Sequence, residues 1–299
     1  MSTALLLLPD FLLIAFGWVL CRFTALDRRL WDGVERLVYY LLFPILLFTT
    51  ILKSPLRPAE TLPLAMAGVG TALCGIALAY VLGRFPGVDA RLHAAGSQTV
   101  FRFNSYIALA LAERLGGAPG LAWMALLIAL CVPLCNVAAV WPLARHGGHA
   151  YGRELLRNPL ILATVGGLLA NLVGLALPTP VATSLQRVGS AALPLGLMAV
   201  GAGLALGGLR SAPGLGAVLL TLRHAAMPAI ALGLSLALKL SGEQRMIVVA
   251  FGALPTSSAA YVLAARLGGN APFVAGLVTL STLLAMLTLP FWLSLAARF

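Results

Sequence analysis

Long apolar runs separated by short polar segments make up almost the whole of this sequence. A helix of about 20 apolar residues crosses a bilayer core about 30 Å thick, and ten runs of roughly that length can be marked. We place them at residues 4–22, 34–52, 62–83, 94–113, 120–144, 158–177, 184–207, 214–238, 246–265 and 272–296. The pattern therefore predicts an all-α integral membrane protein with ten transmembrane helices and little room for a soluble domain.

One motif is written twice. LAERLGGAP at residues 111–119 returns as LAARLGGNAP at residues 263–272, with the two arginines 152 positions apart. Several prolines and glycines recur at an offset of 150. A period of half the chain indicates duplication, so residues 1–150 form the first five-helix repeat and residues 151–299 the second.

An odd number of helices in each repeat gives the second repeat the opposite orientation in the membrane. The sequence therefore predicts an inverted-topology repeat, which is the plan of many secondary transporters. In that plan a site between the two units opens alternately to either side. Eleven basic residues fall on one predicted side and six on the other. Because basic residues collect on the cytoplasmic side, both termini are predicted on the non-cytoplasmic side of the cell inner membrane.

Composition favours the lipid bilayer as solvent. Hydrophobic residues make up 61% of the chain and charged residues 10%, against roughly 25% charged in a typical soluble domain. The net charge of +11 follows from the basic cytoplasmic segments, so nucleic acid is not expected as a partner. The four cysteines all fall in apolar runs, where a thiol acts as a small hydrophobe.

Polar and helix-weakening residues gather in the middle of two predicted helices. The fourth contains SQTVFRFNSYIALA and the ninth contains GALPTSSAAYVLA. Free amide groups and half-helix dipoles at a broken helix can receive a charged solute. With one residue from the fifth helix, the candidate substrate-binding residues are Arg102, Asn104, Ser105, Asn136, Pro255, Thr256, Ser257 and Ser258. The alternative is that the hydroxyls bond back to their own helices and the proline only kinks its helix.

Charged residues inside the predicted spans need partners. A charge at mid-membrane costs at least about 2.5 to 3.5 kcal/mol on insertion scales. Arg102 therefore suggests an anionic guest, with pairing to Asp10, Glu113 or a carbonyl, or snorkelling, as alternatives. Arg223 and His224 lie nearer an interface by this reading, where snorkelling is favoured. Asp10 and Glu113 are the candidates for proton coupling, although a dipole or capping role is slightly preferred for Asp10.

An enzyme inside the membrane would need a nucleophile with a base, paired aspartates or a histidine-rich metal set. The nearest candidate is His146 and His149, which two glycines separate in a basic loop. No catalytic residue, metal or cofactor is therefore predicted. A membrane sensor or assembly scaffold is the alternative from another class, and it predicts a binding site without flux.

Six stretches, taken in order, carry a resemblance to a known family. They are LLPDFLLIAFGWVL, FRFNSYIALA, VPLCNVAAV, RNPLILATVGGLL, ALPLGLMAVGAGL and ALPTSSAAYVLAARLGG. Together they resemble the auxin efflux carrier family, in the bacterial permease branch related to the plant PIN carriers. The resemblance runs over nearly the whole chain. It implies a fold similar to bile-acid sodium symporters and sodium–proton antiporters, in which helices four and nine cross as broken helices.

The same resemblance implies a scaffold domain of helices one, two, six and seven and a transport domain of helices three, four, five, eight, nine and ten. It implies an elevator-type permease for small organic anions, such as indole acetate in plants and malate or malonate in bacterial members. The plant pattern has a proline in each crossover, where Leu111 and Ala260 stand here, which leaves the sharpness of the breaks open. A homodimer through the scaffold, and a sodium-coupled symporter of bile-acid type, stay open as well.

A membrane potential that is negative inside favours outward movement of an anion by about 2.3 kcal/mol per charge per 100 mV. Export of a monoanion is therefore already downhill and needs no coupling ion. Few carboxylates stand within the predicted spans, which favours uniport or modest proton coupling.

Overall fold

The computed structural model describes residues 3–53, 58–144, 159–204, 211–257, 259–266 and 268–299. Within these residues the regular structure is helical, apart from one isolated β bridge between Phe103 and Thr256. The helices, with η marking π-helical turns, are α1 (Thr3–Phe23), α2 (Arg28–Leu37), η1 (Val38–Leu42), α3 (Phe43–Lys53), α4 (Pro58–Leu82), α5 (Ala90–Gly96), α6 (Gln98–Phe101), α7 (Ser105–Ala144), α9 (Pro159–Leu172), α10 (Thr179–Ser190), α11 (Ala192–Ala202), α12 (Pro213–Thr221), η3 (Leu222–Ala226), α13 (Met227–Ala237), α14 (Gly242–Ala253), α15 (Ala259–Arg266) and α16 (Ala271–Ala296).

Helix lengths agree with a membrane protein. In the described part of the chain, five helical stretches are long and apolar enough to cross a bilayer: Arg28–Lys53, Thr61–Leu82, Ser105–Val140, Pro213–Ala237 and Ala271–Ala296. The third is 36 residues long, which at 1.5 Å per residue is about 54 Å, well beyond one bilayer core. Gly117 divides it with φ of 56° and ψ of −142°, a conformation that glycine adopts without strain. The count of ten transmembrane helices stays a prediction, because other predicted spans are shorter or broken.

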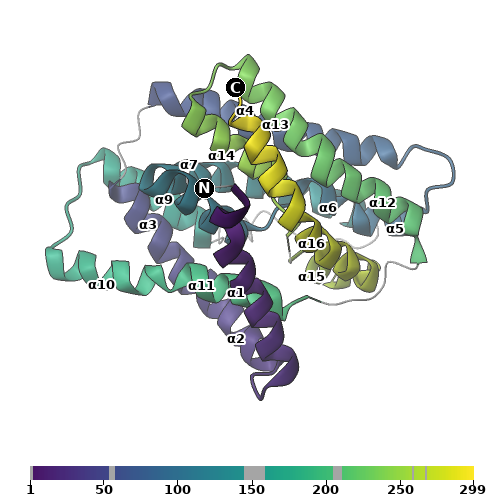
Figure 1. Cartoon of the computed structure of the whole chain (residues 1–299), viewed down its shortest axis with the longest axis horizontal. Helices are drawn as coiled ribbons and strands as arrows, with labels where there is room; N and C mark the ends of the chain where they lie inside the picture. Colours follow the sequence, from purple (N-terminus) through teal and green to yellow (C-terminus); the bar gives the residue numbers. More distant parts are fainter. Residues whose placement is uncertain (1–2, 54–57, 145–158, 205–210, 258, 267) are drawn as a thin grey trace.

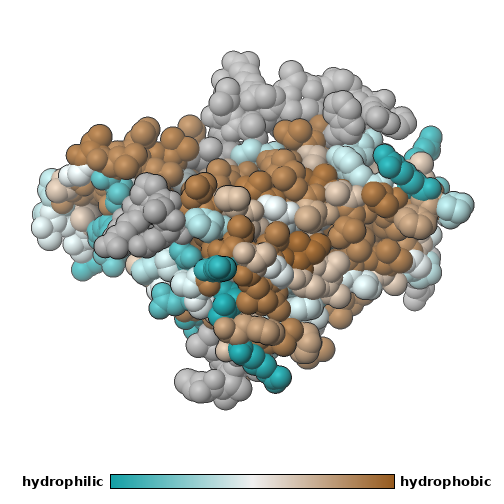
Figure 2. All heavy atoms as spheres, turned by 90° about the horizontal axis from the view of Figure 1, so that it is seen from above, coloured by the Kyte–Doolittle hydropathy of each residue, from teal (hydrophilic) through white to brown (hydrophobic). Residues whose placement is uncertain are grey.

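The outer surface is also apolar. Many large hydrophobic side chains are exposed, among them Leu172, Leu287 and Phe291. Figure 2 shows hydrophobic residues spread over much of the face in view. Exposed apolar patches of this extent are typical of surfaces that face lipid or another chain. The chain is therefore a multi-pass membrane protein.

Helices from the two halves of the sequence pack side by side. α1 packs against α11, and α3 packs against α9 and α10, on the left and lower side of Figure 1. α4, α13 and α14 pack together near the top centre of Figure 1. The contact of α1 with α11 depends on small residues, because a Cβ atom on Gly201 would overlap the carbonyl oxygen of Ile14. The first group contains the helices predicted as the scaffold, while the division into two moving domains stays a prediction.

Both π-helical turns end two residues before a proline, Pro44 and Pro228. Pro228 has no N–H group to donate to the carbonyl of His224 four residues earlier. The indole Nε1 of Trp292 donates to that oxygen instead, at 2.9 Å. The turn keeps both Arg223 and His224 inside, with 1% and 6% of their surface exposed. The snorkelling favoured for these two residues is therefore wrong.

Candidate functional site

Two helices are interrupted near their middles. The first break, at residues 102–104, separates α6 from α7, and the second, at residues 254–258, separates α14 from α15. Pro255 cannot continue a helix, and it disfavours helical geometry in the residue before it. Leu254 accordingly adopts φ of −55° and ψ of 147°. The predicted polar positions of the fourth and ninth helices thus coincide with real breaks.

The two breaks touch each other. Phe103 and Thr256 form an antiparallel bridge. The backbone N–H of Asn104 donates to the carbonyl of Pro255 at 3.0 Å, and Thr256 Oγ1 donates to the carbonyl of Arg102 at 3.2 Å. We call this contact between the two breaks the crossing. Thr256 therefore bonds across the crossing rather than back to its own helix. These contacts join segments about 150 residues apart in the sequence.

Asn104 begins the helix that follows the first break. Its Oδ1 accepts hydrogen bonds from the backbone N–H groups of Tyr106 at 3.0 Å and Ile107 at 3.2 Å, which is the geometry of an N-cap. Its Nδ2 is buried and has no hydrogen-bond partner among the described residues. The side chain thus keeps a donor available at the crossing.

Arg102 is half-buried and is held by an amide. Its Nη1 donates to Oε1 of Gln98 at 2.8 Å, and Nε2 of Gln98 donates to the carbonyl of Ala260 at 3.2 Å. The ion pairs between described residues do not include Arg102. The alternative in which Arg102 pairs with Asp10 or Glu113 is therefore wrong, and the charge of Arg102 has no carboxylate counterpart in the described part of the chain.

The remaining predicted site residues lie around the crossing. Ser105 is the first residue of α7 and Ser257 follows Thr256, both half-buried. Asn136 is half-buried in α7, next to Cys135, whose Sγ donates to the carbonyl of Phe101 at 3.4 Å. α7 therefore passes beside the first break. Ser258 lies outside the described residues, as does the loop that carries the two candidate histidines.

Asp10 is 8% exposed and lies well inside α1, not at its start. Because the dipole effect falls off within the first turn, the dipole or capping role preferred from the sequence is wrong. Its Oδ2 instead accepts from Nε of Arg114 at 2.6 Å, which ties α1 to α7. Glu113 is exposed. Asp10, one of the two candidates for proton coupling, is thus engaged in an ion pair between α1 and α7.

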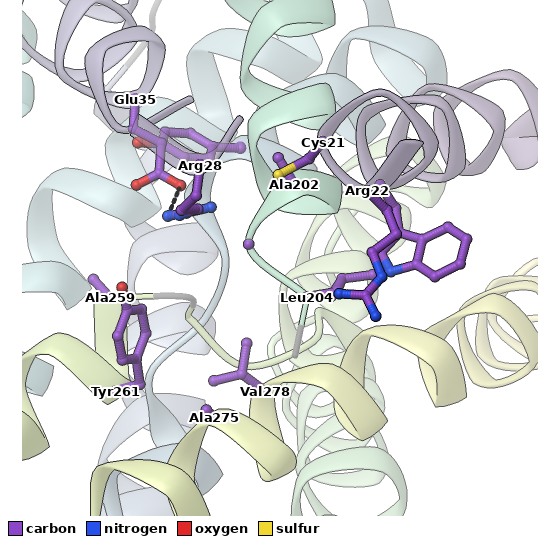
Figure 3. A pocket seen from close by; sticks show the side chains of 13 residues that line it. Cys21, Arg22, Arg28, Glu35, Ala202, Leu204, Ala259, Tyr261, Ala275 and Val278 are labelled. Carbon is purple, nitrogen blue, oxygen red and sulfur yellow. Dashed lines mark hydrogen bonds and ion pairs between the residues drawn. The ribbon is translucent and has the colours of Figure 1, made fainter. Parts of the chain in front are cut away.

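A cavity of about 510 Å³ opens between α1, α2 and α11 on one side and α7, α15 and α16 on the other (Figure 3). Tyr106, in the first turn of α7, and Ala259, the first residue of α15, both line it. The cavity is therefore reached by the N-terminal ends of the helices that follow both breaks. Each such end carries about half a positive charge from the helix dipole. Its size falls within the usual range for small-molecule sites.

Two arginines and a glutamate add charge to this cavity. Arg28 Nη2 donates to Oε1 of Glu35 at 2.9 Å, and Arg28 Nε lies 3.0 Å from Oδ1 of Asp32. Figure 3 shows the Arg28–Glu35 pair on the wall from α2, Tyr261 on the wall from α15, and Arg22 farther along. Sequence reasoning missed these lining residues. The spacing of Arg28, Asp32 and Glu35 on one helical stripe is the signal that could have found them.

A second cavity, of about 600 Å³, is lined by Asp10, Glu113 and Arg114 with residues of α3, α10 and α11. Along α11, the first cavity touches Ala202 and the second touches residues 193–197. The two cavities thus lie toward opposite ends of the same helix. The linings do not include Arg102, Asn104, Asn136 or Thr256. The crossing adjoins the first cavity through Tyr106 and Ala259.

The sequence is similar to known membrane proteins. Residues 145–293 match a family described as "Membrane transport protein". A protein of Rhizobium meliloti (strain 1021) named "Putative malonate transporter" is 24% identical over 314 residues, which cover 95% of this chain and 92% of that protein. The similarity therefore extends over both breaks and both cavities.

Proposed function

The chain belongs to the auxin efflux carrier family of membrane transport proteins, and from this premise we propose that it is a secondary transporter of small organic anions. Carboxylates are the substrate class that we favour, and the name of the Rhizobium relative makes malonate the first compound to test. The proposed mode is alternating access between the two faces of the membrane.

The observation that carries this proposal is the cavity reached by the N-terminal ends of α7 and α15. Two half-helix dipoles pointing into one space attract an anion and not a cation. In our proposal the charge of Arg102 adds to this attraction. Asn104, Ser105, Asn136, Ser257 and Ser258 supply polar contacts, while Pro255 and Thr256 shape the second break. The antiparallel bridge between the breaks supports the inverted repeat, because two units related by an axis in the membrane plane meet in opposite directions.

The proposed movement takes place along the interface that contains both cavities. α1, α2, α3, α9, α10 and α11 would stay as the scaffold, and α4 to α7 and α12 to α16 would move as the transport unit. Because the cavities lie toward opposite ends of α11, a shift along this interface would enlarge one and close the other. This is the elevator form of alternating access, and the ion pair of Asp10 with Arg114 would have to open during it.

Flux into liposomes tests the proposal. Purified protein is reconstituted, and labelled malonate is followed under an imposed membrane potential, with the neutral diamide malonamide as the matched solute. We expect malonate flux that responds to the potential and exceeds that of protein-free liposomes, with no malonamide flux. Binding of malonate without any flux would favour the sensor class. If none of a panel of carboxylates is bound or transported, the proposal is overturned.

A further inference from the structure

Arg223 joins the two broken helices from a third helix. Its Nη1 donates to the carbonyl of Val100 at 2.9 Å, and its Nε donates to the carbonyl of Leu254 at 2.6 Å. Val100 lies in α6, just before the first break, and Leu254 caps the end of α14, just before the second. Carbonyls at helix C-termini lack partners within the helix and form the negative end of its dipole. One buried guanidinium therefore bonds to the C-terminal ends of both first half-helices.

These carbonyls are the groups with which a discontinuous-helix carrier would hold a coupling ion. Half-helix C-termini and unwound backbone carbonyls coordinate Na⁺ in such carriers. Here the carbonyls of Val100 and Leu254 are already bonded to a side chain that carries a permanent positive charge. A sodium ion bound to the same oxygens would stand beside the guanidinium and be repelled. The crossing thus has its cation built into the chain.

Two buried donors at the crossing lack partners. Nη2 of Arg223 and Nδ2 of Asn104 have no hydrogen-bond partner among the described residues. The two residues bond to the carbonyls of consecutive residues. The guanidinium of Arg223 donates to the carbonyl of Leu254, and the backbone N–H of Asn104 donates to the carbonyl of Pro255. Burying a donor without a partner is costly, which points to a ligand that accepts from both. A carboxylate offers two oxygens for two donors.

We propose that Arg223 is a tethered cation that takes the place of a coupling sodium ion and offers its Nη2 group to the carboxylate of the substrate. The carboxylate part rests on the proposed function, whereas the replacement of sodium does not. The further consequence is that transport is independent of sodium, unlike in a symporter of bile-acid type.

Neighbouring contacts hold Arg223 in register with the second break. The backbone N–H of Thr256 donates to Oγ of Ser281 at 3.0 Å, and that oxygen lies 2.8 Å from Nε2 of His224. Nδ1 of His224 lies 3.0 Å from Oγ1 of Thr288, whose hydroxyl donates to the carbonyl of Leu284. Every group in this series of hydrogen bonds has a partner when the hydroxyl of Ser281 donates to Nε2 of His224 and Nδ1–H of His224 donates to Thr288. This arrangement makes His224 a neutral tautomer. The histidine then adds no second charge beside Arg223.

The first test uses the unmodified protein without substrate. Its thermal unfolding midpoint is measured in sodium chloride and in N-methylglucamine chloride at equal ionic strength. A ligand at free concentration L that binds the folded state stabilises it by RT ln(1 + L/Kd), so the midpoint rises with the ligand concentration. We expect the same midpoint in both salts. A rise that is specific to sodium and grows with the sodium concentration at constant ionic strength would overturn the proposal, whatever the substrate proves to be.

The second test removes the tethered cation and returns it in solution. Arg223→Ala should lower the unfolding midpoint and weaken malonate binding at least about tenfold, the equivalent of one charge-assisted hydrogen bond. Methylguanidinium at low concentration should then raise the midpoint of this variant and restore binding. The exposed Arg84 supplies the control, because methylguanidinium should not stabilise Arg84→Ala. No response of Arg223→Ala to methylguanidinium, or a response equal to that of the control, would count against the proposal.

Arg223→Lys covers the case in which the alanine variant does not fold. Lysine keeps the charge but not the planar fork. We expect its unfolding midpoint to stay independent of sodium while its malonate affinity falls at least about tenfold. Unchanged affinity would contradict the role of Nη2. If the unmodified protein neither binds nor moves any carboxylate, the proposed function fails, and the sodium and methylguanidinium measurements still decide the role of Arg223.

Discussion

Asn104 allows the proposed anion site to be changed without changing the fold. Its Oδ1 caps α7, while its Nδ2 has no partner among the described residues. Asn104→Asp keeps an oxygen for the cap and has nearly the same shape. The only group that changes is the free donor Nδ2, which becomes a negatively charged oxygen. The substitution therefore separates capping from substrate binding at one position.

Both effects can be estimated. Asp and Asn are about equal at an N-cap, where a negative charge is favourable by about 0.3 to 1 kcal/mol. Asn104 is 2% exposed, and a charge at mid-membrane costs about 2.5 to 3.5 kcal/mol, so Asn104→Asp should be less stable by about 1.5 to 3 kcal/mol. A substrate carboxylate would lose a hydrogen bond worth about 1.5 to 3 kcal/mol. It would also meet a like charge, which costs about 3 kcal/mol at ~5 Å with an effective dielectric constant of ~20. Even the smaller loss weakens binding by more than about tenfold, and both together by about a thousandfold.

Asn270 provides the matched control. It caps α16 through a hydrogen bond from the N–H of Phe273 at 3.0 Å, so Asn270→Asp is the same chemical change at a cap away from the crossing. Malonate affinity and unfolding midpoint are measured for both variants. We expect a lower midpoint and a loss of affinity in Asn104→Asp, and little change of either in Asn270→Asp, because Asn270 is half-buried. Unchanged malonate affinity in a folded Asn104→Asp protein would refute the placement of the anion at this donor.

Three further predictions follow from the same geometry. Arg102→Gln should weaken anion binding by about tenfold with little loss of stability, measured by malonate titration, and equal affinity would end its proposed role. Asp10→Asn combined with Arg114→Gln should show non-additive losses of about 1 kcal/mol in a double-mutant cycle of unfolding midpoints, and additivity would mean that the ion pair contributes nothing. Gly201→Ala should lower stability by about 1 to 3 kcal/mol by forcing α1 from α11, whereas Gly233→Ala, with open space around its Cβ, should not.

The breaks at the crossing were predictable because their causes are local. A proline and a run of hydroxyl residues weaken a helix at their own position, whatever surrounds it. The offset between the two repeats then placed Asn104 and Thr256 at matching depth, and the structure brings the two breaks together, with Phe103 bridged to Thr256 and Asn104 bonded to Pro255. The division into ten spans rests on the same local signal, and the predicted gap between residues 113 and 120 coincides with the turn at Gly117.

Contacts between distant helices were not predictable in this way. Asp10 and Arg114 are 104 positions apart, and their pairing depends on how α1 crosses α7. The first cavity combines residues of six helices, so its lining follows from packing and not from any one motif. Arg28 and Glu35 were not among the residues that the sequence argument proposed for the site. Their stripe became informative once α2 was seen to face α15.

Arg102 and Arg223 show how a charge inside a membrane helix should be interpreted. Arg223 is the eleventh residue of the stretch Pro213–Ala237, so it lies about 15 Å from the helix start, near the middle of a 30 Å core. A side chain at that depth cannot reach the surface and must find oxygen atoms nearby. The only abundant oxygens at mid-membrane are carbonyls freed by a broken helix. An arginine midway along an unbroken span therefore predicts a break in a neighbouring helix. In this protein Arg223 bonds to carbonyls beside two such breaks.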